Sequence, residues 1–193
     1  MRRPGPAGLA IAAAVVAAAA ILFIAARTWR GTDTPPAPAD LPAAVPAPAE
    51  RKITATLYYI SEDGMSLVGT QREVPFGEGV LEQARHVVDA QLGPAPPPLA
   101  SAIPEGTTLR GLYVTERGDA FVDLSGDVRT NHTGGALDEL FTVYAIVDAL
   151  TVNLPAIARV QILIEGREVD TLAGHVDLRH PLRKSLQWVS NES

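Results

Sequence analysis

A stretch of alternating side chains in the middle of the chain limits the fold more than any other feature. Residues 103–125 contain two runs of β-forming residues, separated at 116–119 by a short reversal in which Gly118 can take a positive φ. Apolar and polar residues alternate in both runs, which predicts strands with one buried face and one face that is wet or partly covered. The stretch therefore predicts a β-hairpin, and it contains no recognisable chemistry.

Similar patterns predict further strands and helices on both sides of this hairpin. Their order, β-β-α-β-β-α-β, predicts an α+β sandwich in which two helices pack against one mixed sheet. The region 127–135 is expected to be a loop, and the tail is expected to be irregular. The predicted elements are strands at 52–60 and 66–74, a helix at 77–92, strands at 107–115 and 120–125, a helix at 136–152, a strand at 159–164 and a short strand near 168–172.

The two predicted helices differ in how much of their surface is apolar. Helix 77–92 has an apolar stripe that includes Val80 and Leu81, and it is followed by Gly93, a candidate positive-φ cap, and by Pro94, which stops it. Helix 136–152 carries eight large apolar residues that wrap most of its circumference. We therefore expect helix 136–152 to be the most buried helix of the fold.

The first 50 residues predict a membrane anchor followed by a spacer. Residues 1–8 form a short cytoplasmic tail, and residues 9–26 are an unbroken apolar run of 18 residues that predicts a transmembrane signal-anchor. A cleaved signal peptide is the alternative, because the run is rich in alanine. Residues 27–50 form a Pro/Ala-rich linker that favours an extended spacer. Residues 51–190 then form a domain outside the cytoplasm.

Charge and cysteine content exclude several classes of function. The chain has 16 basic and 22 acidic residues, and residues 51–193 hold 12 of the basic and 19 of the acidic ones. An acidic domain without a basic stripe is a poor candidate for binding nucleic acid. Because the chain has no cysteine, it has no disulfide framework, no thiolate metal site and no lipid-anchored cysteine.

The residue types that carry catalysis occur without the spacing that catalysis needs. The four histidines are scattered, no HExxH motif is present, and the glycines after His132 lack the lysine of a phosphate-binding loop. Asp138 and Glu139 are interpreted as first-turn charges that the helix dipole favours. The sequence therefore assigns no catalytic, cofactor-binding or metal-binding residue and predicts no cofactor. The four histidines are His86, His132, His175 and His180.

The order of the predicted elements, and the glycine and proline residues between them, resemble the GerMN domain family. This family is named for a membrane-anchored sporulation and germination protein. Each motif is weak by itself, but their order and spacing are fairly specific, and together they cover residues 53–166. The matching segments are 55–59, 67–68, 72–74, 92–94, 101–107, Gly118, Ala120, 122–125, 146–147, Thr151, Pro155, Val160 and 165–166.

The resemblance implies an extracytoplasmic α/β module of the bacterial envelope, without assigned catalytic residues. It also implies similarity to the ring-building domains of secretion-type assemblies. Two departures matter: the sporulation protein carries a tandem pair of such domains where this chain has room for one, and lipid-anchored relatives carry a cysteine. A sporulation role therefore does not transfer.

Two functions from different classes follow. The first is a non-enzymatic interaction domain, held on the cytoplasmic membrane by a single helix, that engages an envelope protein, a second copy or cell-wall material. The alternative is a small extracytoplasmic hydrolase or ligand-binding protein. That alternative requires a polar pocket near Asp123, Ser125 or His132.

Overall fold

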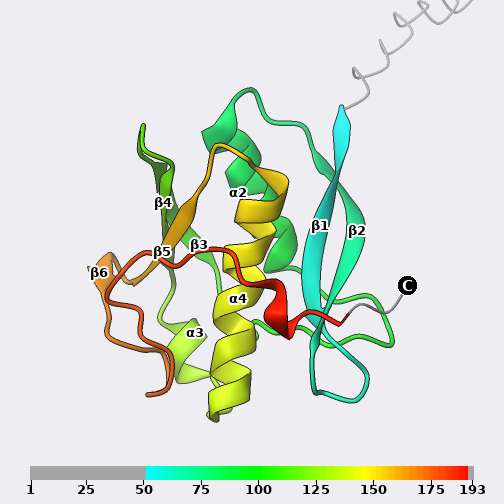
Figure 1. The fold of residues 1–193 in the computed structure, drawn as a ribbon, viewed down its shortest axis with the longest axis vertical. Helices are drawn as coiled ribbons and strands as arrows, with labels where there is room; N and C mark the ends of the chain where they lie inside the picture. The colour runs from blue at the N-terminus through cyan, green and yellow to red at the C-terminus, as the bar shows by residue number, and fades with distance from the viewer. Residues whose placement is uncertain (1–50, 191–193) are drawn as a thin grey trace, which may run out of the picture. The chain divides into compact units, whose positions relative to one another are not determined.

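In the computed structural model, which describes residues 51–190, two long helices lie between two β-sheets (Figure 1). The first sheet is the β1–β2 hairpin, and the second has the strand order β3-β4-β5-β6. The elements are β1 (Lys52–Ile60), β2 (Leu67–Pro75), α2 (Val80–Gln91), β3 (Leu109–Val114), β4 (Asp119–Leu124), α3 (Asp127–Thr130), α4 (Ala136–Asn153), β5 (Arg159–Ile164), β6 (Arg167–Glu168) and the 3-10 turn η1 (Leu186–Trp188).

The helices form the middle layer of the fold. Helix α4 contacts β1 on one side and β5 on the other, while α2 contacts β1 and β2 on one side and β3 on the other. Figure 1 shows this arrangement, with the β1–β2 hairpin on one flank and β3, β4 and β5 on the other. The α+β class is confirmed, and the four-stranded sheet is mixed as expected, because β4 and β5 pair in parallel while its other strand pairs are antiparallel. The expectation of a single sheet is wrong, since β1 and β2 form a sheet of their own.

Side-chain amides at the ends of both helices explain why the sheets are separate. Gln91, the last residue of α2, accepts a hydrogen bond from Tyr58 N (2.9 Å) and donates to Tyr58 O (2.7 Å). Asn153, the last residue of α4, makes the same pair of bonds with Thr56 (2.8 and 2.7 Å). These amides occupy the edge of β1 where a neighbouring strand would pair. The β1–β2 hairpin is therefore closed off from the larger sheet.

The predicted hairpin at the centre of the sequence is confirmed as β3 and β4. The strands pair antiparallel with Leu112 opposite Val122, and β5 joins β4 in parallel with Ile162 opposite Val122. Gly118 has a φ of +80°, and a Cβ there would lie 2.7 Å from the carbonyl oxygen of Ala156. The reversal therefore requires glycine both for its backbone conformation and for the close approach of the next loop.

Several local predictions need correction. Residues 127–130 form the short helix α3 rather than a loop, and the tail strand lies at Arg167–Glu168 rather than near 168–172. Gly93 does not have a positive φ. The C-cap residue after α2 is Leu92, and it keeps a helical conformation. Val80 and Leu81 are exposed, since they lie in the first turn of α2, and the stripe is buried only from Ala84 onward.

The predicted transmembrane segment at residues 9–26 and the linker at 27–50 lie outside the described residues. Within residues 51–190, no helix combines the length and apolar character needed to cross a membrane. These residues enclose a hydrophobic core of their own. Because a self-contained core is the condition for independent folding, we expect the fragment 49–193 to fold by itself.

Helix α4 is the most buried helix, as expected, with ten buried residues against five in α2. Val147 is fully buried, so Val147→Ala is expected to lower the free energy of unfolding by about 2 kcal/mol through lost methyl contacts and a cavity. Asp138 is exposed, and Asp138→Ala is expected to cost less than half as much. Urea denaturation of fragment 49–193 measures both values, and equal losses would contradict the central position of α4.

Candidate functional site

Three residues mark the places where the hydrolase alternative expects a polar pocket, and each of them bonds within the protein. Asp123 accepts hydrogen bonds from Gly166 N (2.7 Å) and from Arg110 Nε (3.4 Å). Ser125 donates to a carboxylate oxygen of Asp127 at 2.9 Å. His132 bonds to neither of them, and within residues 51–190 no hydrogen bond joins any two of the three. They therefore do not form a nucleophile, base and acid arrangement.

A pocket of about 300 Å³ lies beside His132, near the start of α4. Polar side chains on its wall come from Ser101, from the 131–133 loop and from α4, and apolar ones come from Ile60 and residues 102–104. Asp123 and Ser125 are not among them. The lining residues are Ile60, Ser101, Ala102, Ile103, Pro104, Asn131, His132, Thr133, Asp138 and Thr142.

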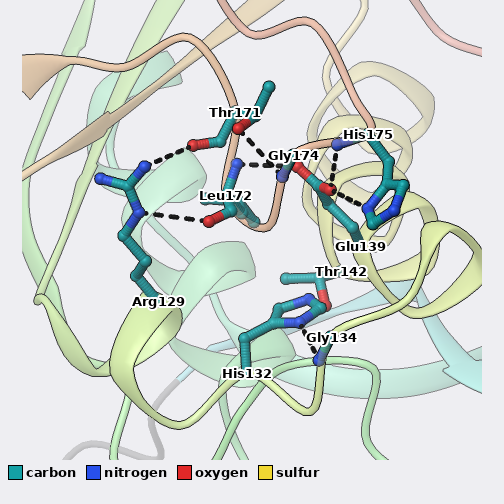
Figure 2. A network of polar contacts seen from close by, with 9 residues as sticks. All are labelled: Arg129, His132, Gly134, Glu139, Thr142, Thr171, Leu172, Gly174 and His175. Atoms are coloured by element: carbon teal, nitrogen blue, oxygen red, sulfur yellow. Dashed lines mark hydrogen bonds and ion pairs between the residues drawn. The ribbon is translucent and has the colours of Figure 1, made fainter.

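Both ring nitrogens of His132 are engaged, as Figure 2 shows for the bond from Gly134. Gly134 N donates to Nδ1 at 3.0 Å, so Nδ1 carries no proton and the neutral ring holds its proton on Nε2. Nε2 then donates to the hydroxyl oxygen of Thr142 at 3.3 Å, and that hydroxyl donates to Ala102 O at 2.6 Å. The ring is therefore fixed by the protein rather than poised to take a proton from a substrate.

A buried carboxylate at the start of α4 holds the C-terminal tail (Figure 2). Glu139 is fully buried, and it accepts hydrogen bonds from Leu172 N (2.7 Å), His175 N (2.7 Å) and His175 Nδ1 (3.1 Å). On the other side of the same segment, Arg129 donates to the carbonyl oxygens of Thr171 (3.3 Å) and Leu172 (3.2 Å). Residues 171–175 are thus fixed between α3 and α4.

Glu139 is a first-turn charge of α4, as expected, but it is buried and holds the tail, which the sequence did not indicate. Burial by itself would raise the pKa of Glu139, but the backbone N–H groups of residues 172, 173, 175 and 176 stabilise the carboxylate and lower the pKa below its ordinary value. Glu139 therefore remains ionised. Its partners lie more than 30 positions away, and nothing in their sequence marks them as donors to a helix.

A second buried carboxyl, Asp148, was also missed. It lies on α4, it is fully buried, and one oxygen accepts a hydrogen bond from Ser185 N at 2.9 Å. The other oxygen has no hydrogen-bond partner among the described residues. Burial raises the pKa of Asp148 to about 6, against smaller lowering contributions from the bond with Ser185 and from Lys184. The same helix thus anchors the tail at two points.

The remaining histidines, His86 and His180, do not belong to a group of metal ligands within residues 51–190. His86 is half-buried with Nδ1 at 3.0 Å from Pro75 O, and His180 is exposed. Within residues 51–190, no three histidine, aspartate or glutamate side chains are placed to hold a metal ion. The polar groups around α4 thus bind the protein's own loops.

Comparison with known proteins identifies the family. The family model described as Germane, sporulation and spore germination, matches residues 56–170, which is more than half of the chain. The chain belongs to the Germane family. The predicted resemblance to GerMN domains is therefore confirmed. No match was found among curated proteins.

Solved structures support the same fold for this Germane domain. The tandem GerMN domains of the sporulation protein GerM from Bacillus subtilis match with a TM-score of 0.54 and 21% identity, over 69% of this chain and 46% of that chain. The first GerMN domain of the same protein matches with a TM-score of 0.51 and 20% identity, over 68% of this chain and 95% of that chain. At these identities the likeness concerns the fold.

Asp148 predicts a pH dependence for the stability of the Germane domain. Its pKa is about 6 in the folded state and 3.8 in the reference state, so folding is favoured most when Asp148 is protonated. Its contribution to the free energy of unfolding is therefore fully present below pH 3.8 and is lost as the pH rises through about 6. The loss is on the order of 2 to 3 kcal/mol.

Urea denaturation of wild type and Asp148→Asn between pH 4 and pH 7 tests this dependence. The asparagine can still accept from Ser185 N but does not titrate, so the wild type should lose stability relative to the variant as the pH rises. Asp89→Asn, at an exposed position of α2, is the matched control and should show a constant difference from wild type. A constant difference for Asp148→Asn as well would contradict the assignment.

Proposed function

We propose that this Germane-family chain is a non-enzymatic interaction domain of the bacterial cell envelope. Residues 9–26 anchor it as a single-pass protein in the cytoplasmic membrane, and residues 27–50 present the domain outside the cytoplasm. Its partner is an envelope protein, a second copy of the chain or cell-wall material. Membership of the Germane family and the apolar run before the domain support this proposal.

The observation that carries the non-enzymatic part is the engagement of the polar side chains around α4. Both ring nitrogens of His132 are bonded within the protein, and the carboxylate of Glu139 holds the tail. The alternative, a small hydrolase or ligand-binding protein, rests on the pocket at His132. That pocket can hold a small molecule, but a hydrolase also needs a free base beside a nucleophile.

A topology reporter tests the membrane part of the proposal. Alkaline phosphatase, which is active only after export, is fused after residue 50 with and without residues 9–26. Activity should depend on residues 9–26, and membrane extraction followed by mass measurement should find the segment still attached. An exported product that lacks residues 1–26 would instead support the cleaved signal peptide.

A binding experiment tests the interaction part. Fragment 49–193 is immobilised and exposed to detergent-solubilised membrane proteins and to purified cell-wall sacculi, and its self-association is measured by sedimentation. We expect reproducible binding in one of these three arms. The same fragment unfolded in urea before immobilisation is the control, and absence of binding in all three arms would overturn the proposal.

A further inference from the structure

The outer face of the four-stranded sheet, which points away from the helices, carries an exposed tyrosine beside a buried carboxylate. Tyr113 and Gly111 lie on the same face of β3, and Asp123 on β4 is directly opposite Gly111. Tyr113 is 65% exposed, whereas Asp123 is buried. Tyrosine is enriched at binding surfaces, because its ring is apolar and its hydroxyl can form a hydrogen bond.

Gly111 brings the tyrosine ring and the carboxylate together. Cε2 and Oη of Tyr113 lie 3.4 and 3.7 Å from the point where a Cβ on Gly111 would be, and Cβ of Asp123 lies 3.8 Å from that point. A Cβ at position 111 would therefore be in van der Waals contact with both side chains. The ring lies next to Gly111, with the half-buried Phe121 directly opposite on β4, and 65% of the tyrosine remains exposed.

The polar groups beside the ring form a connected set in which one guanidinium pairs with two carboxylates. Arg110 bonds to both Asp123 and Glu165, and the backbone N–H groups of Gly166 and Gly126 donate to the other oxygens of these carboxylates at 2.7 and 2.8 Å. Each carboxylate oxygen has one donor and retains a lone pair. Glu165 has a φ of +53° and is the only non-glycine residue with positive φ within residues 51–190. This set suits hydroxyl groups better than an anion, which the carboxylates would repel.

The outer face of the sheet is covered on its β5 side and open on its β3 side. On β5, Gln161 is buried and donates to Leu178 O, so the C-terminal tail covers that side. On β3, Tyr113 remains open. The free edge of β3 is poorly suited to pairing with a peptide strand, because Arg85 donates to Leu112 O and a register shift interrupts the strand between Leu109 and Gly111.

We propose that Tyr113, with Arg110, Asp123 and Glu165 beside it, binds the neutral glycan strands of the cell wall. The apolar face of a sugar ring stacks on Tyr113, and its hydroxyl groups bond to the free lone pairs of the carboxylates. An extended glycan suits an open sheet face, because successive sugars can lie along the strands. This inference rests on the proposed function. Of the three kinds of partner named there, it selects cell-wall material.

Titration calorimetry with a hexamer of β-1,4-linked N-acetylglucosamine, and co-sedimentation with purified sacculi, test the proposal on fragment 49–193. Tyr113→Ala should weaken both interactions at least about tenfold, while Tyr113→Phe, which keeps the ring, should stay within about threefold of wild type. Met65→Ala is the matched control, because Met65 is 69% exposed on the other sheet's turn. Circular dichroism checks that all variants fold.

The outcomes separate this inference from the proposed function. Absence of saccharide binding, or equal binding by Tyr113→Ala and wild type, would overturn the glycan site. If an envelope protein or a second copy still binds in that case, the interaction function stands without it. Equal binding of a maltose hexamer, an α-linked glucan, would overturn the assignment to the cell wall.

Discussion

Gln91→Leu is expected to lower the free energy of unfolding by about 3 kcal/mol, although leucine is similar in size and more apolar. Gln91 is fully buried, and its amide satisfies both the N–H and the C=O of Tyr58. Leucine would leave these two buried backbone groups without partners, and each such group costs about 1–3 kcal/mol. The gain from burying a more apolar side chain offsets only part of this cost.

Urea denaturation of fragment 49–193 measures the loss, and amide hydrogen exchange at Tyr58 locates it. Gln71→Leu is the matched control, because Gln71 is exposed on β2 and should change stability by no more than about 0.5 kcal/mol. If both variants lose equally little free energy of unfolding, Gln91 does not hold the edge of β1. The separation of the two sheets then needs another cause.

Glu139→Ala is expected to lower the free energy of unfolding by a similar amount, about 3 kcal/mol at pH 7. The change removes a carboxylate that accepts from Leu172 N, His175 N and His175 Nδ1, and hydrogen bonds to charged groups are worth about 1.5–3 kcal/mol each. Some of the lost bonds can be replaced by water, since His175 is exposed. Hydrogen exchange at Leu172 should rise about a hundredfold, because this segment loses its attachment to α4.

The pH dependence of the Glu139 effect has a definite sign. The pKa of Glu139 is lowered in the folded protein, so its contribution is present above the unfolded-state pKa and is lost as the pH falls through the lowered value. The difference between wild type and Glu139→Ala should therefore shrink in acid. Glu82→Ala, at an exposed first-turn position of α2, should cost less than 1 kcal/mol. A Glu139 effect as small as that would show that the tail is held elsewhere.

Most of the local elements and the family could be predicted from the residue pattern. Three of these predictions depend only on neighbours within about one turn or one strand. They are the alternation on β3 and β4, the reversal at Gly118 and the apolar circumference of α4. Such neighbours favour a local conformation that can be predicted without knowing the distant contacts. The order of these elements then sufficed for the resemblance to GerMN domains, which the family match to residues 56–170 confirmed.

The layering and the roles of the buried polar groups depend on contacts between residues that are far apart in the sequence. Gln91 and Asn153 look like ordinary polar residues at helix ends, yet each closes the edge of a strand that is 33 or 97 positions away. Glu139 likewise meets its donors 33 and 36 positions away. A hydrogen bond between distant residues leaves no periodic pattern in the sequence. Whether a polar side chain is solvated or holds two layers together is therefore decided when the chain folds and water leaves the core.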